Sequence, residues 1–134
     1  METVCQQMPK VVIEKVHAVG MRHYGIRQLN INVRMNVVPE PNNRYDSNAI
    51  KICDDTSPTT RAYLARYHAS HIKTLFDKHL VKHRVMKLKA KMPIKKIGNV
   101  STQICNIAFL TDTINIDEVK LVLGNMPHVT IKLD

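Results

Sequence analysis

The histidines are the residues best suited to bind a metal ion, and four of the seven fall in or just after one predicted helix. On a helical wheel His68, His71 and His79 fall within about 80° of one another, but His68 and His79 are about three turns apart. A metal site needs three or four ligands that converge on one ion. His79 and His83 are close enough to share an ion, yet no third ligand and no Cys-x-x-Cys pair accompanies them. The sequence therefore predicts no metal site, and histidines that are partly buried or face a ligand.

The carboxylates are too scattered to predict catalysis. They include Glu40, Asp46, Asp54, Asp55, Asp112, Asp117 and Glu118. A two-metal nuclease needs carboxylates that converge on its ions. The chain also has no Walker phosphate loop, no nucleophile elbow and no Cys–His pair at a characteristic spacing. We expect neither an enzymatic activity nor a cofactor.

Positive charge is concentrated in one part of the chain. The protein has 20 Lys and Arg against 11 Asp and Glu, a net charge of +9. Residues 61–96 contain eleven of the basic residues and a single acid, Asp77. Such an excess usually faces a polyanion, either a nucleic acid or an acidic membrane, and the alternative is a solubilising surface.

Three lysines, Lys87, Lys89 and Lys91, alternate with apolar residues and so lie on one face of one predicted strand. They would form an electrostatic track for a nucleic-acid strand, with a marked salt dependence of binding. The alternative is the solvated face of a strand, or an edge that lysines protect against aggregation. The run KLKAKMPIKK, residues 87–96, also resembles a nuclear localisation signal, so we expect the protein in the nucleus.

Length and composition indicate a single domain over residues 1–134, with 44% hydrophobic residues to form its core. No apolar run approaches the ~18 residues that span a bilayer, and the N-terminus lacks a signal-peptide core. The cysteines Cys5, Cys53 and Cys105 are odd in number and far apart. We therefore expect no disulfide scaffold, a reducing intracellular compartment, and a buried Cys53.

Hydrophobic patterning predicts many short strands interrupted by helices. Strands are expected at residues 11–19, 29–37, 48–53, 61–64, 83–92, 103–110 and 128–133, and helices at 65–80 and 117–123. Loops are expected at 39–47, 54–60 and 93–101, and a helix stop at Gly124-Asn125. This order indicates a mainly β fold with inserted helices, a small OB-like β-barrel.

Three motifs stand in order along the first half of the chain. They are VGMRHYG at residues 19–25, EPNNRYDSNAIKI at 40–52 and AYLAR at 62–66. Together they resemble the HIRAN domain, best known as an N-terminal module of Rad5-like, SNF2-type DNA translocases at stalled replication forks. The resemblance is clearest over about residues 11–80. It implies an OB-like barrel that captures the 3′ end of single-stranded DNA in replication or repair, here as a stand-alone domain.

The resemblance implies a role for each residue of the end site. Asp46 would accept a hydrogen bond from a free 3′-hydroxyl and repel a phosphate in its place. Tyr45 would stack on the terminal base, and Asn43 would bind sugar or a base edge. Arg22 and Arg66 would hold backbone phosphates.

The chain departs from the family pattern at four places, the first being Ala62, where the family usually has glycine before the third motif. The aromatic residue expected after the first arginine is His23, with Tyr24 following, and either ring could face the base. Tyr63 stands where the family has histidine, either as another stacking ring or as cover for the core. The aromatic residue of a later strand has no clear counterpart; Thr102 or Gln103 is nearest.

Two alternatives remain open at this point. Asn and Asp residues of the second motif could simply cap a tight loop before the next strand. The fold could also survive as an adaptor with a decayed end pocket, whose basic face docks an acidic protein or RNA. The expected partners are single-stranded DNA or DNA 3′ ends, with replication or repair proteins, and no membrane.

Overall fold

The structure is a computed structural model that describes residues 8–82 and 85–133. Its strands are β1 (Lys10–Val19), β2 (Met35–Pro39), β3 (Ile50–Asp54), β4 (Thr60–Leu64), β5 (Met86–Ala90), β6 (Lys95–Ile97), β7 (Val100–Leu110) and β8 (Thr130–Leu133). The helices are α1 (Arg66–Asp77) and α2 (Ile116–Leu123), with short 3₁₀ turns η1 (Met21–Tyr24) and η3 (Thr113–Asn115).

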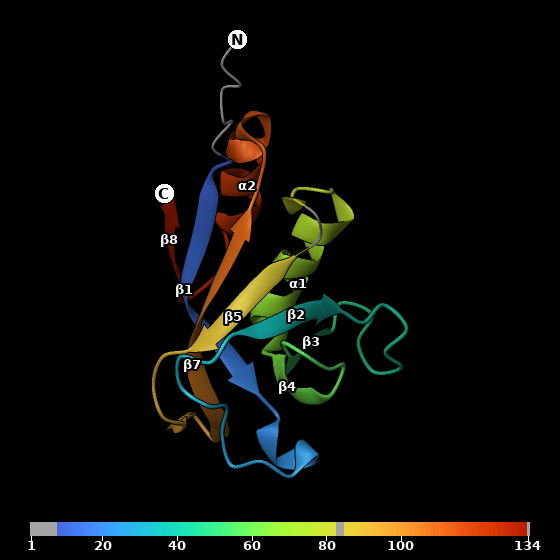
Figure 1. The fold of residues 1–134 in the computed structure, drawn as a ribbon, viewed down its shortest axis with the longest axis vertical. Helices are drawn as coiled ribbons and strands as arrows, with labels where there is room; N and C mark the ends of the chain where they lie inside the picture. The colour runs from blue at the N-terminus through green and yellow to red at the C-terminus, as the bar shows by residue number, and fades with distance from the viewer. Residues whose placement is uncertain (1–7, 83–84, 134) are drawn as a thin grey trace.

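Six of the strands close into a barrel (Figure 1). They follow the order β7-β5-β2-β3-β4-β1, and β1 pairs with β7 again, each pair antiparallel. β6 extends this sheet from β7, and β8 extends it from β1. The expected fold class, a small mainly β barrel with inserted helices, is confirmed.

Strand β1 changes its inward-facing residues partway along its length. Val11 and Ile13 are buried before an irregularity in its pairing with β7, and Val16 and Ala18 are buried after it. Lys15, at this β-bulge, has a left-handed φ of 69°. An extra residue in a strand reverses the alternation of its side chains, so His17 faces away from the barrel interior.

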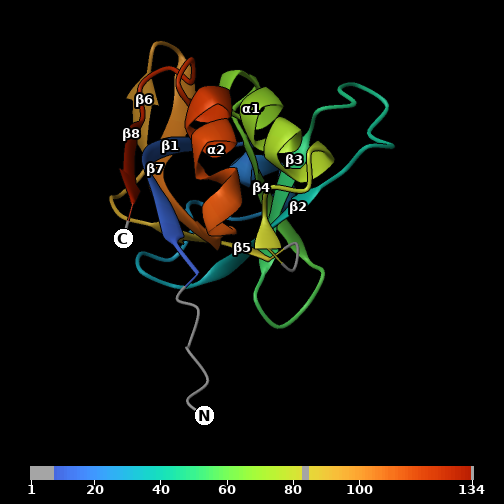
Figure 2. The same cartoon turned by 90° about the horizontal axis from the view of Figure 1, so that it is seen from above.

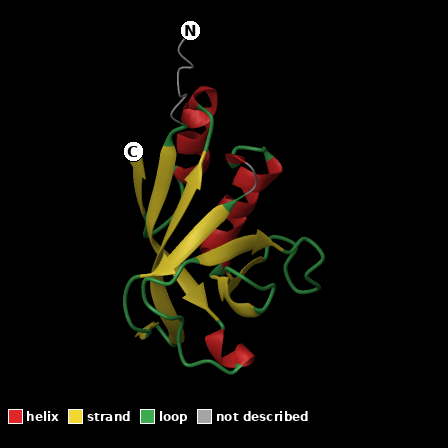
Figure 3. Cartoon of the chain, viewed as in Figure 1, coloured by secondary structure: helices red, strands yellow, loops and turns green. Residues whose placement is uncertain are grey.

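Helix α1 packs on the barrel through its buried residues Ala69, Ile72 and Leu75. Figure 2 shows α2 beside α1, and Figure 3 shows η1 at the opposite end of the barrel from α2. The helix ends at Asp77 rather than at residue 80, and a left-handed residue, His79, follows it. Leu80 is still buried in the hydrophobic core, and its N–H donates back to the Leu75 carbonyl.

The strand expected at residues 29–37 is wrong in its first part, because β2 begins only at Met35. Asn32 adopts a left-handed φ of 62°, and Ile31 and Val33 are exposed. Leu29 is buried and bonded through both backbone groups to the amide of Gln103. Alternation alone cannot distinguish such an anchored irregular segment from a strand, and Asn tolerates the left-handed turn.

The basic loop expected at residues 93–101 is instead a β-hairpin. β6 pairs with β7 in the register Lys95 with Thr102 and Ile97 with Val100. Gly98 sits in the turn at φ 62°, where a glycine avoids the strain of a Cβ. β7 therefore starts three residues earlier than expected. The last strand starts two residues later, after His128 at a left-handed φ of 67°.

Both described cysteines are buried free thiols, which confirms the expectation for Cys53. Burial raises the pKa of the Cys105 thiol to about 12, so it stays protonated at neutral pH. Cys5 lies outside the described residues. None of the helices in residues 8–82 and 85–133 has the length and hydropathy to cross a membrane.

Candidate functional site

The three sequence motifs meet around one open pocket of about 660 Å³. Seven of the eleven predicted DNA-binding residues line it: His23, Tyr24, Asn43, Tyr45, Asp46, Tyr63 and Arg66. They come from η1, from the loop between β2 and β3, from β4 and from the first residue of α1. We call this the motif pocket. His23 and Arg66, 43 positions apart in the sequence, thus share one site.

The loop between β2 and β3 is held by its own side chains. Oδ1 of Asn43 accepts hydrogen bonds from the N–H groups of Tyr45 and Asp46, at 2.9 and 3.0 Å. The Asn43 amide donates to Glu40, and Oδ1 of Asp46 accepts from the Asn48 N–H at 2.9 Å. The tight-loop interpretation of this motif is therefore confirmed. It does not exclude a binding role, because Asp46 has a second carboxylate oxygen.

That second oxygen of Asp46 lies 3.9 Å from Nε of Arg66. The Asp46 side chain is 21% exposed and the Arg66 side chain 77% exposed. A recessed anion thus lies beside a cation that reaches into solvent. The pair can accept a hydroxyl proton at the carboxylate and attract a phosphate at the guanidinium.

Glu40 is a member of the site that sequence reasoning missed. The Tyr63 hydroxyl donates to its Oε1 at 2.7 Å, and the hydrogen bonds from Asn43 and Tyr63 hold the pKa of Glu40 below its usual value. Burial, together with Glu40, raises the pKa of Tyr63. Glu40 stands in the second motif, so the motif itself was the available signal. The carboxylate fixes the Tyr63 ring, whose centroid lies 6.0 Å from that of Tyr24.

Replacing Tyr63 with phenylalanine tests this anchoring. We expect Tyr63→Phe to lower the free energy of unfolding by about 1 kcal/mol, because the ring stays while Glu40 loses a donor. Urea unfolding at pH 7 measures the change. The matched variant Tyr45→Phe removes a hydroxyl from a ring that is 78% exposed. It should leave stability within about 0.5 kcal/mol, and an equal loss in both variants would contradict the anchoring role.

The remaining predicted pocket residues lie in different places. Arg22 is exposed on η1, but it is not among the residues that line the motif pocket. Thr102 and Gln103 are buried and do not line it either. From β7 the pocket is lined by Val100. The hairpin that brings Val100 to the pocket was not expected from sequence.

Lys87, Lys89 and Lys91 line a different concave face, over β1, β5 and β7. Among the described residues this face and the motif pocket have no lining residue in common. The lysines share one side of β5 as expected, but they do not open into the motif pocket. Their role as a track for DNA stays a prediction.

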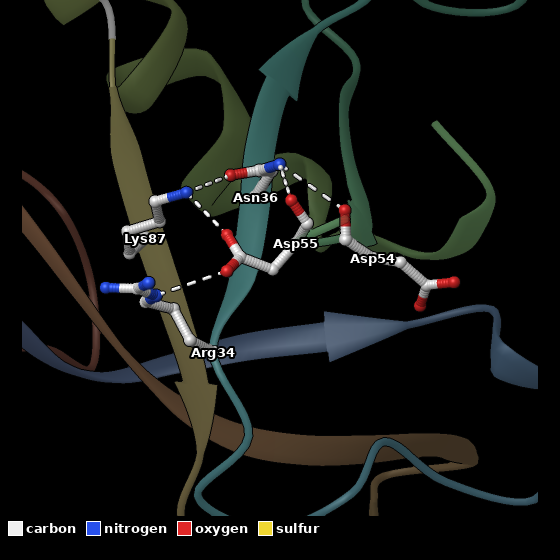
Figure 4. A network of polar contacts seen from close by, with 5 residues as sticks. All are labelled: Arg34, Asn36, Asp54, Asp55 and Lys87. Carbon is white, nitrogen blue, oxygen red and sulfur yellow. Dashed lines mark hydrogen bonds and ion pairs between the residues drawn. The ribbon is translucent and has the colours of Figure 1, made fainter. Parts of the chain in front are cut away.

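The three lysines also differ in how far other side chains of the protein engage their ammonium groups. Nζ of Lys87 lies 2.6 Å from Oδ1 of Asp55 and 2.5 Å from Oδ1 of Asn36 (Figure 4). Arg34 contacts the other carboxylate oxygen of Asp55 at 3.3 Å. The hydrogen bond from Lys87 is the main reason that the pKa of Asp55 is lowered. The positive charge of Lys87 is thus largely neutralised by Asp55 within the protein.

We therefore expect Lys87→Ala to lower the urea midpoint at pH 7 more than Lys89→Ala does. The pKa of Asp55 is depressed in the folded state, so its stabilising effect is complete above the ordinary value of 3.8. It is lost as the pH falls below 3.8 through the lower folded pKa. The two variants should therefore converge in acid. A difference that does not shrink as the pH falls below 3.8 would contradict the ion pair as its cause.

His68, one of the histidines considered as a metal ligand in the sequence, is fully buried. Its Nδ1 accepts the His17 N–H at 3.0 Å, and its Nε2–H donates to the Pro127 carbonyl at 2.7 Å. Burial lowers the pKa of His68 to about 4. In the described part of the chain, no three His, Cys, Asp or Glu residues are grouped to hold a metal ion, and His83 lies outside that part.

The chain was compared with models of protein families. The model of the family described as HIRAN domain matches residues 14–96. The search of curated proteins found no matching relative.

Solved structures share the fold. The crystal structure of the HIRAN domain of human HLTF has a TM-score of 0.70 and 22% identity, covering 91% of this chain and 95% of that one. The NMR structure of the HLTF HIRAN domain in its DNA-bound conformation has a TM-score of 0.62 and 22% identity, covering 84% and 91%. A protein from Lactobacillus plantarum has a TM-score of 0.54 and 19% identity, covering 75% and 96%.

Proposed function

The chain belongs to the HIRAN domain family, and from this premise we propose that it is a non-catalytic module that binds single-stranded DNA and recognises its 3′-hydroxyl end. The observation that carries the proposal is the recessed Asp46 carboxylate beside the exposed Arg66. The DNA-bound conformation of the HLTF HIRAN domain, which has the same fold, supports DNA as the ligand.

In this proposal the motif pocket distinguishes a strand end from internal backbone. A terminal hydroxyl donates to the free oxygen of Asp46, whereas a terminal phosphate meets its negative charge. Arg66 pairs with the phosphate on the 5′ side of the terminal nucleotide. The terminal base stacks on the exposed rings of Tyr45 and Tyr24, which line the pocket. Because every base has a flat face, the recognition is independent of sequence.

The proposed setting is the nucleus, where the module would recruit proteins to DNA 3′ ends, or protect these ends, during replication or repair. The basic segment from Arg61 to Lys96 supports a polyanionic partner. Lys89 and Lys91, on the concave face over β5, would add binding energy that is independent of the strand end.

The test compares short single-stranded oligonucleotides that differ only in a 3′-hydroxyl or a 3′-phosphate, by fluorescence anisotropy at two salt concentrations. We expect tighter binding of the hydroxyl end at both, because salt weakens phosphate contacts more than the hydrogen bond at the end. Equal binding of both ends that disappears at high salt would contradict end recognition. It would favour an adaptor that docks RNA or an acidic protein through its basic face.

A further inference from the structure

The motif pocket continues into a second, larger hollow of about 830 Å³. Val19, Arg66 and Val100 line both. We call the second hollow the side groove. Its distinctive residues are Lys15, His17, Tyr67, Lys95, Ile97 and His128. A DNA strand whose 3′ end occupies the motif pocket can therefore continue along the adjoining surface of the second hollow.

The side groove is built by the irregular parts of the fold. The bulge in β1 sets Lys15 in a left-handed conformation and turns His17 outward. The β6–β7 hairpin supplies Lys95 and Ile97, and its position at the η1 end of the barrel places it next to the motif pocket (Figure 1). His128 is left-handed as well. Strained non-glycine residues persist where the surrounding structure holds them, and they often mark functional sites.

The charge of the side groove suits a polyanion. Lys15, Arg66 and Lys95 line it, and its described lining residues include no carboxylate. The motif pocket differs in this respect, because it contains Asp46. The side groove can thus bind phosphates without the opposing charge that selects a hydroxyl at the end.

A cluster of flat rings lies in the same groove. The ring centroids of His17 and His128 are 5.7 Å apart and the planes 13° from parallel. Tyr67 meets His17 edge-on at 5.5 Å and is 44% exposed. Burial, with the nearby His128 and Lys95, lowers the pKa of His17, so its ring is uncharged at neutral pH. His17 itself is buried, so Tyr67 and His128 are the exposed rings of the cluster. Exposed rings beside cations can bind successive bases and phosphates of a single strand.

We propose that the side groove holds the nucleotides immediately 5′ of the terminal one, with their phosphates on Lys15 and Lys95 and their bases against Tyr67 and His128. This inference rests on the proposed function, since the motif pocket sets which end of the strand is bound. It places the nucleotides next to the bound end in the side groove, whose lining residues do not include the lysines of β5.

The first experiment measures affinity against length, using oligothymidylates of two and eight nucleotides. The groove variant is Lys15→Gly with Lys95→Ala, in which glycine suits the left-handed position. Its matched control is Lys96→Ala with Lys120→Ala, which removes the same charge from exposed lysines that do not line the side groove. We expect the groove variant to bind the octamer about tenfold more weakly and the dimer less than about twofold more weakly.

The salt dependence of octamer binding is a second measurement on the same variants. Two lost phosphate contacts should reduce the slope of log affinity against log salt by about 1.4 for the octamer. An unchanged slope, or an equal effect of the groove variant and its control, would overturn the proposal. Circular dichroism establishes that both variants are folded.

Stacking is tested with 2-aminopurine at the second or third position from the 3′ end. Binding to the wild-type protein should quench its fluorescence, and Tyr67→Ala with His128→Gly should abolish the quenching. Quenching that persists in this variant would overturn the role of the rings.

The two proposals fail in different ways. If end recognition is wrong, 3′-hydroxyl and 3′-phosphate octamers bind equally to every protein tested, including the wild type. If the groove proposal is wrong, wild type and groove variant gain the same affinity from dimer to octamer, whichever end group the oligonucleotide has.

Discussion

Replacing Asp46 with asparagine should remove the preference for a 3′-hydroxyl end and leave the fold intact. Asparagine keeps an Oδ1 that can accept the Asn48 N–H, so the loop retains its turn. Its second atom becomes a neutral donor in place of the carboxylate oxygen. Because a hydrogen bond to a charged group contributes about 1.5–3 kcal/mol, the hydroxyl end should bind roughly 10- to 100-fold more weakly.

The 3′-phosphate end should behave in the opposite way. Without the repulsion from the carboxylate, its affinity for Asp46→Asn should equal or exceed its affinity for the wild type. Anisotropy with both oligonucleotides gives the ratio of the two dissociation constants, which should approach one. Asp46→Ala should lose the same preference and, in addition, stability, because the Asn48 N–H loses its acceptor.

The control for Asp46→Asn is Asp117→Asn, in the exposed first turn of α2. It changes the net charge by the same amount at a residue that does not line the motif pocket. It should leave the ratio of the two dissociation constants at the wild-type value. A preference for the hydroxyl end that survives in Asp46→Asn would contradict the assignment of this carboxylate.

Acid should destabilise the protein strongly through His68. The pKa of His68 is about 4 in the folded state, below the ordinary value of 6.5, because the ring is buried. Between these values the unfolded state binds more protons than the folded state. The stability contributed by the neutral ring is therefore complete above pH 6.5 and is lost as the pH falls toward 4. The full loss is about 3 kcal/mol.

Urea unfolding at pH 7, 6, 5 and 4.5 measures this effect. His68→Gln removes the titrating group and can still donate to the Pro127 carbonyl. It should be less stable than the wild type at pH 7 and lose less stability on acidification. The stability of this variant should still depend somewhat on pH, because burial also lowers the pKa of His17.

The control is His79→Gln, which removes an exposed histidine beyond the end of α1. Its stability should follow the wild-type pH profile. A profile for His68→Gln as steep as that of the wild type would contradict His68 as the main acid-sensitive group.

Some features of the site depend on partners that no local pattern reveals. Lys87 and Lys89 belong to the same alternating run of lysines and apolar residues. In the structure Lys87 forms an ion pair with Asp55, while Lys89 is exposed. In the sequence Glu40 is one of several scattered acids, whereas in the structure it accepts a hydrogen bond from the Tyr63 hydroxyl. The position of Val100 followed from a hairpin that the turn residues Gly98 and Asn99 could have indicated.

The mainly β barrel, the helix after the third motif and the motif residues that meet in the pocket could all be predicted from the sequence. Period-two and period-3.6 patterns report local burial, and the ordered motifs identify a family. The bulge at Lys15, the irregular path before Met35 and the groove that opens beside Arg66 could not be predicted in this way. These depend on strand register and on contacts between residues far apart in the chain, which local hydrophobic periodicity does not encode.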